Sequence, residues 1–140
     1  MGAVGIYAYV DGSDLESVFS LIERAGHEFL VSRAWSVPAR LISTHYARTP
    51  DLNQDDLSQW NLGFNLDFPH GSISAGAFED VRAIARFVAD LYPRSQREFV
   101  FGIVDEAKVD EDFAFIGSDP TRVEEFVDVL RHFSGRVPAA

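Results

Sequence analysis

The stretch LGFNLDF at residues 62–68 alternates apolar and polar side chains without a break. A period of two is typical of a β-strand with one buried face, because successive side chains point to opposite sides of a sheet. The apolar positions of residues 77–92 instead recur every three or four residues, which predicts an amphipathic helix. Pro93 disfavours helical geometry at the residue before it, so we expect this helix to end at Tyr92. The two patterns together predict a sheet that is covered by helices.

Two further helices are predicted from the residues that mark their ends. The first begins at a capping box, Ser13–Glu16, whose side chains satisfy backbone N–H groups, and ends at Gly26. The last begins at Asp119-Pro120, an N-cap followed by proline at the first helical position, and ends at Gly135.

Alternation predicts five more strands, at residues 4–10, 29–35, 40–47, 99–103 and 113–115. The expected order of elements is β-α-β-β-β-α-β-β-α. Strands that follow one another favour hairpins, which indicates an α+β, two-layer sandwich with a mainly antiparallel sheet of about six strands and three helices packed on it. Because β-α-β connections occur twice, a partly parallel, three-layer arrangement is the alternative.

The composition is that of one globular domain spanning residues 1–140, with residues 136–140 expected to fray. The chain has 22 acidic and 12 basic residues, a net charge of −10, which argues against nucleic acid and anionic membranes as direct partners. It has no cysteine, no apolar run long enough to cross a membrane and no secretory signal at its start. We therefore expect a cytoplasmic protein.

The negative charge is concentrated near the C-terminus, where residues 98–140 hold ten acids and four basic residues. Five of these acids lie between two aromatic strands, at the expected tip of a hairpin: Asp105, Glu106, Asp110, Glu111 and Asp112. A patch of one sign attracts a partner of the opposite sign, although a solubilising loop has the same composition. Asp55, Asp56 and Trp60 form a second candidate contact, because an aromatic residue beside acids suits an interface. A tryptophan that folds its loop onto the sheet is the alternative there.

A polar site on the sheet is the main alternative to this acidic surface. It would consist of His45, Asn65, Asp67 and His70, which could meet if the strands at residues 40–47 and 62–68 pair. Such a set could act as an acid–base pair or as a metal site with two histidines and one carboxylate. None of the spacings is diagnostic, and a solvated sheet face has the same residues. We find no phosphate loop, dinucleotide fingerprint or nucleophile elbow, and we expect no catalytic residue, metal or cofactor.

These observations favour an acidic, single-domain protein-binding module over an enzyme. The most concrete version is an inhibitor of the bacterial immunity or antitoxin type, which binds and neutralises a basic toxin or enzyme such as a nuclease. A small enzyme or ligand-binding protein that uses the polar site is the first alternative. A subunit of a larger assembly is the second, and a homo-oligomer is left open.

Overall fold

The computed structural model describes residues 3–11, 15–46, 59–68, 73–105 and 110–135. Within these ranges the chain forms five strands and three helices. In chain order they are β1 (Ala3–Val10), α1 (Phe19–Val31), β2 (Ala39–Tyr46), β3 (Gln59–Asp67), α2 (Ala75–Ser95), β4 (Phe99–Asp105), β5 (Asp110–Ile116) and α3 (Thr121–Gly135). None of the helices in these ranges is long and apolar enough to cross a membrane.

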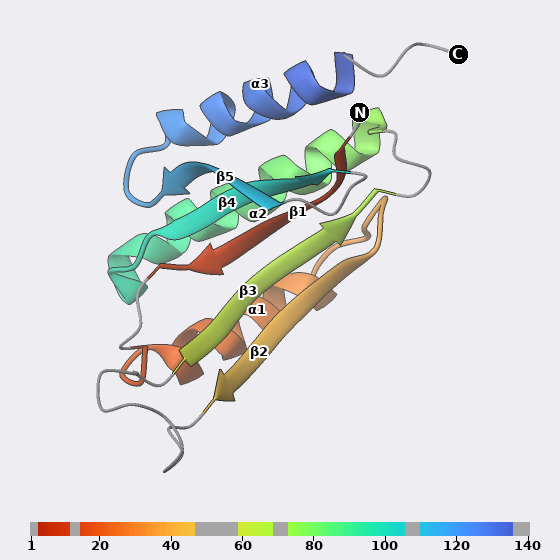
Figure 1. Ribbon diagram of the computed structural model, residues 1–140. Helices are drawn as coiled ribbons and strands as arrows, with labels where there is room; N and C mark the ends of the chain where they lie inside the picture. The colour runs from red at the N-terminus through yellow and green to blue at the C-terminus, as the bar shows by residue number, and fades with distance from the viewer. Residues whose placement is uncertain (1–2, 12–14, 47–58, 69–72, 106–109, 136–140) are drawn as a thin grey trace.

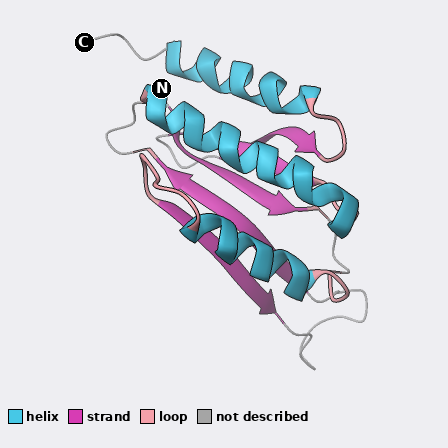
Figure 2. Ribbon diagram, turned by 180° about the vertical axis from the view of Figure 1, so that it is seen from behind, coloured by secondary structure: helices cyan, strands magenta, loops and turns pink. Residues whose placement is uncertain are grey.

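The strands form one sheet in the order β2-β3-β1-β4-β5, and every neighbouring pair is antiparallel. All three helices lie on the same side of the sheet, with α2 between α1 and α3, and no described helix covers the other side (Figure 1, Figure 2). The first six elements follow the ferredoxin-like order β-α-β-β-α-β, and β5 and α3 extend it beyond β4. The predicted α+β sandwich is therefore confirmed, with five strands instead of about six and without parallel pairs.

The strand predicted at residues 29–35 is wrong, because α1 runs through its first part and a loop follows. The helix also continues past Gly26, where we expected it to end. A Cβ atom at Gly26 would lie 3.1 Å from Leu41 Cδ1 and 3.3 Å from Phe64 Cζ. This glycine therefore permits close contact between α1 and the sheet and does not act as a helix stop.

The other predicted helix ends have mixed outcomes. α1 begins at Phe19, several residues after the predicted capping box, of which Ser13 lies outside the described residues. α2 includes Pro93 in its last turn and ends at Ser95. Because proline has no backbone N–H, Pro93 costs the helix a single hydrogen bond. The predicted cap of α3 is confirmed, because Asp119 Oδ1 accepts hydrogen bonds from the backbone N–H and the hydroxyl of Thr121, at 3.0 and 2.7 Å.

The core lies between the sheet and the helices. Its largest fully buried side chains come from both layers: Ile6, Leu15, Ile22, Leu62, Phe64, Leu66, Ile84, Phe99, Phe101, Ile103, Ile116 and Phe126. Aromatic rings link the layers, and the rings of Phe101 and Phe126 meet edge to face with centroids 5.1 Å apart.

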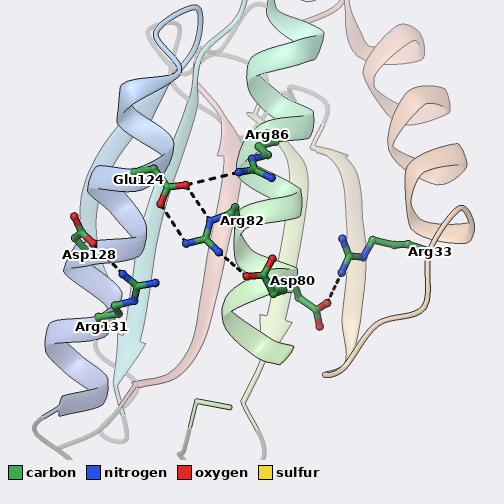
Figure 3. A network of polar contacts seen from close by, with 8 residues as sticks. Arg33, Asp80, Arg82, Arg86, Glu124, Asp128 and Arg131 are labelled. Carbon is green, nitrogen blue, oxygen red and sulfur yellow. Dashed lines mark hydrogen bonds and ion pairs between the residues drawn. The ribbon is translucent and has the colours of Figure 1, made fainter. Parts of the chain in front are cut away.

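One carboxylate, Asp80 of α2, is fully buried within this layer. It accepts hydrogen bonds from Arg33 Nη2 at 2.9 Å and from the backbone N–H groups of Ser36 and Val37 at 2.7 and 3.1 Å. Figure 3 shows the pair of Arg33 and Asp80 at the side of α2 that faces the loop after α1. Since a buried charge must be paired to be tolerated, Asp80 fixes the connection between α1 and β2.

Candidate functional site

The predicted acidic hairpin exists as the antiparallel pair of β4 and β5. Its register places Asp110 opposite Val104, Glu111 opposite Ile103 and Asp112 opposite Gly102. Asp105 ends β4 and Asp110 begins β5, so these acids share one end of the edge strand pair. Glu106 and the tip that joins the strands lie outside the described residues. We call the five acids Asp105, Glu106, Asp110, Glu111 and Asp112 the acidic end.

A β-bulge separates the acidic end from the rest of β5. Phe101 pairs with Ala114, and the next residue of β4, Gly102, pairs with Asp112. β5 therefore has one residue more than its partner at this point, which bends an edge strand and increases its twist.

The acids of α3, which packs against β5, are engaged in ion pairs. Glu124 accepts two hydrogen bonds from Arg82 of α2, from Nε at 2.9 Å and from Nη2 at 3.2 Å (Figure 3). These bonds lower the pKa of Glu124 and raise the pKa of Arg82. On α3 itself, Asp128 lies 3.4 Å from Arg131, and Glu125 lies 3.9 Å from Arg122. Most of the negative charge of α3 is thus balanced by arginines nearby.

The face of the sheet opposite the described helices carries two tyrosines on β1, the central strand. Tyr7 lies over Gly102 of β4, and Tyr9 lies over Gly63 of β3, so that a side chain at either glycine would overlap with a ring. The two ring centroids are 5.6 Å apart, and the Tyr9 hydroxyl donates a hydrogen bond of 3.0 Å to Asn65 Oδ1. We call Tyr7 and Tyr9 the tyrosine platform.

The sequence reasoning missed the tyrosine platform. The signal for it was a glycine in the interior of each neighbouring strand, at positions 63 and 102. Glycine weakens a strand, and it commonly marks a place where another group approaches the backbone closely.

The strands of the proposed polar site pair as expected, but their register keeps His45 away from Asn65. His45 lies opposite Trp60, and Asn65 lies opposite Arg40, five positions from His45 and so about 17 Å along the strand. Asp67 forms an ion pair with Arg40, with Nη2 and Oδ2 3.7 Å apart. In the part of the chain that the structure describes, no three His, Asp or Glu residues are grouped so as to hold a metal ion.

The remaining candidate residues are only partly placed. His70, Asp55 and Asp56 lie outside the described residues, and the backbone of Trp60 belongs to β3. The contact proposed for Asp55, Asp56 and Trp60 stays a prediction.

Comparison with known proteins gives no relative: no family model, curated protein or solved structure matches the chain. The functional argument therefore depends on the residues and their geometry.

Proposed function

We propose that the chain is a protein-binding domain that binds and inhibits a basic protein through the acidic end of the β4–β5 hairpin. The observation that supports this most is the register of β4 and β5, which groups Asp105 with Asp110, Glu111 and Asp112 at one end of the edge strand pair. The partner class that fits is a toxin or enzyme with a positively charged active site, such as a nuclease. The chain would then act as a bacterial immunity or antitoxin protein does.

The contrast with α3 strengthens the choice of surface. The three acids of α3 lie near arginines, as Glu124 does near Arg82. Residues 105–112 offer one lysine for five acids, and like charges held together weaken a fold unless something compensates for them. A partner that normally binds phosphates suits such a group of acids, because its cationic groove attracts carboxylates by the same long-range field.

The test replaces three acids and compares two variants of equal charge. The hairpin variant carries Asp110→Ser, Glu111→Ser and Asp112→Ser. The control carries Glu16→Ser, Glu28→Ser and Asp90→Ser, which removes three exposed acids outside the sheet. The basic protein that the unmodified chain retains from the source organism is purified, and its association rate with each variant is measured.

We expect the hairpin variant to associate about tenfold more slowly than the control at low salt, and the difference to shrink at high salt. The unmodified chain should also inhibit the activity of the retained protein. Equal association rates for the two variants would contradict the proposal.

A further inference from the structure

The two edges of the sheet differ in how freely their backbones can pair with another strand. β5 has a bulge between Asp112 and Ala114, and bulges protect an edge strand against further pairing. β2 instead pairs with β3 through eight successive residues without a register shift. Arg40 is its single Arg, Lys, Asp or Glu residue, so charge gives this edge little protection. β2 is therefore the edge that can accept another strand.

One hydrogen bond shows which backbone groups of β2 point away from the sheet. Asp67 donates its N–H to the carbonyl oxygen of Pro38 at 3.1 Å, one residue before β2 begins. Because hydrogen-bonded pairs occupy alternate positions of an antiparallel ladder, Arg40 and Ile42 also bond to β3. The positions between them face outward, and no described strand or helix lies on that side (Figure 1). The outward N–H and C=O groups belong to Ala39, Leu41, Ser43 and His45.

An exposed flank of α1 lies beside this edge. Glu23 of α1 accepts a hydrogen bond from the hydroxyl of Ser43 on β2. His27 and Val31 follow one and two turns later on the same flank. Both are exposed, and Val31 is 85% exposed although it is a large apolar residue. α2 packs against the opposite flank of α1, at Phe29. The outer edge of β2 and this flank of α1 thus form one surface.

The position of α1 allows two copies of this surface to meet. Gly26 lies against Leu41 of β2 and Phe64 of β3, so α1 runs over the boundary between the two strands (Figure 2). If β2 pairs with β2 of a second copy, strands about 4.8 Å apart place the axes of the two α1 helices about 10 Å apart. Helices pack against one another at about this distance. Pairing of the strands would therefore also bury the exposed flanks of the helices.

A second copy fits this surface better than an extended peptide of another protein. A register with its two-fold axis at Ile42 gives every outward backbone group of β2 a partner. Its hydrogen-bonded pairs are Ala39 with His45 and Leu41 with Ser43. Arg40 does not meet its own copy in this register, because it lies opposite Thr44. A peptide would satisfy the same strand edge but would leave the flank of α1 exposed.

The charges of the chain are compatible with this pairing. β5, which begins with three acids, forms the opposite edge of the sheet. Joining two copies at β2 leaves the two β5 strands nine strand spacings apart, or about 43 Å, which is several Debye lengths at physiological salt. The two α1 helices run antiparallel about the same axis, which brings Glu23 of one copy beside His27 of the other. An imidazole N–H can donate a hydrogen bond to that carboxylate.

We infer that the surface formed by β2 and the exposed flank of α1 is a homodimer interface. The two β2 strands pair antiparallel about a two-fold axis at Ile42, and the two α1 helices pack side by side over them. This inference goes beyond the proposed function and does not depend on it, because β5 lies at the opposite edge of the sheet.

The first test combines sedimentation with amide hydrogen exchange of the unmodified chain over a range of concentrations. We expect a dimer at high concentration that dissociates on dilution. In the monomer, β3 should protect the amides of Arg40 and Ile42, whereas the amides of Leu41 and Ser43 should exchange quickly. In the dimer all four amides should be protected.

Three results would overturn the inference. The first is a chain that stays monomeric at millimolar concentration. The second is a dimer in which the amides of Leu41 and Ser43 still exchange quickly. The third is protection of these two amides in the monomer, because the edge would then be covered within one chain.

Two matched variants locate the interface. Ile42→Lys places two like charges against each other at the two-fold axis and should raise the dimer Kd at least about tenfold. Val100→Lys is the control, because Val100 lies in the same row of opposed residues and is also half-buried, but on the interior strand β4. It should dimerise as the unmodified chain does, and equal effects of the two variants would contradict the interface. If either variant does not fold, the exchange pattern of the unmodified chain decides.

The outcomes distinguish this inference from the proposed function. The hairpin variant, which lacks three acids of β5, should dimerise as the unmodified chain does. Loss of the dimer in that variant would place the interface at β5 and overturn the inference. A monomeric chain that still inhibits a basic protein would overturn the dimer alone, and a dimer that binds no basic protein would overturn the proposed function alone.

Discussion

The two faces of the sheet differ although the same strands build both. On the face toward the helices, Ile6, Phe64 and Phe101 are almost fully buried. On the opposite face, the next residues in the chain, Tyr7, Asn65 and Gly102, stand in one row that no described helix covers. Alternate positions of each strand thus have different roles. The residues that face the helices stabilise the fold through burial, whereas the residues on the opposite face can be substituted to fit a partner. The predictions that follow test this division.

The largest loss should come from the helix-covered face. Phe101 is fully buried and meets Phe126 edge to face. Phe101→Ala should lower the free energy of unfolding by about 3–5 kcal/mol, because it removes apolar contact and leaves a cavity. Denaturant unfolding measures this loss. A loss no greater than that of Tyr7→Ala would contradict the division between the faces.

The buried carboxylate on α2 should rank second. Asp80→Ala leaves the guanidinium of Arg33 and the N–H groups of Ser36 and Val37 without their acceptor. We expect a loss of about 2–4 kcal/mol in the free energy of unfolding. Asp90→Ala, at an exposed position of the same helix, is the control and should cost less than about 0.5 kcal/mol. Similar losses for the two variants would show that the loop after α1 does not depend on Asp80.

A substitution at Gly102 tests the contact with Tyr7 on the face of the sheet that no described helix covers. Valine favours strands, but at this position its side chain would overlap with the ring of Tyr7. Gly102→Val should therefore cost about 1–3 kcal/mol, and adding Tyr7→Ala should recover most of the loss. Thermal unfolding of the single and double variants gives the coupling. Additive losses would mean that Tyr7 does not lie over Gly102.

The smallest effect is expected at the surface pair of Arg82 and Glu124. The side chain of Glu124 is 53% exposed, so Glu124→Gln should cost only about 0.5–1 kcal/mol at neutral pH. Arg82 lowers the pKa of Glu124 in the folded state, so the pair stabilises the fold above the ordinary pKa of glutamate and loses this effect as pH falls through the lowered value. The free energies of unfolding of the unmodified chain and of the Glu124→Gln variant should therefore become equal as the pH is lowered. A gap that is independent of pH would point to packing instead of charge.

Elements whose apolar residues recur with one clear period could be predicted from the sequence. The wrong predictions have physical reasons. The alternation of residues 62–68 predicted β3 correctly. At residues 29–35 the pattern misled, because α1 continues to Val31 and Phe29 packs against the core from the helix. Gly26 signals a helix end in the sequence but serves a close contact with Leu41 and Phe64.

The candidate sites show the same limit. The acids at residues 105–112 could be located because the hairpin brings neighbours in the chain together. The tyrosine platform could not, because Tyr7 meets Gly102 only through the pairing of β1 with β4. Register also separates His45 from Asn65, and one sequence alone does not fix the register of distant strands.

The central position of β1 has a consequence for the order of folding. The hairpins β2–β3 and β4–β5 each join strands that are neighbours in the chain, separated by 12 and 4 residues, so each closes a smaller loop than β1 does. β1 joins them by pairs such as Tyr9 with Gly63 and Val10 with Phe99, which are 54 and 89 residues apart in the chain. β1 precedes both hairpins in the chain, yet we expect it to be enclosed last, since long-range pairs form late. The tyrosine platform is complete only after that step, because Tyr7 of β1 lies over Gly102 of β4 and Tyr9 lies over Gly63 of β3.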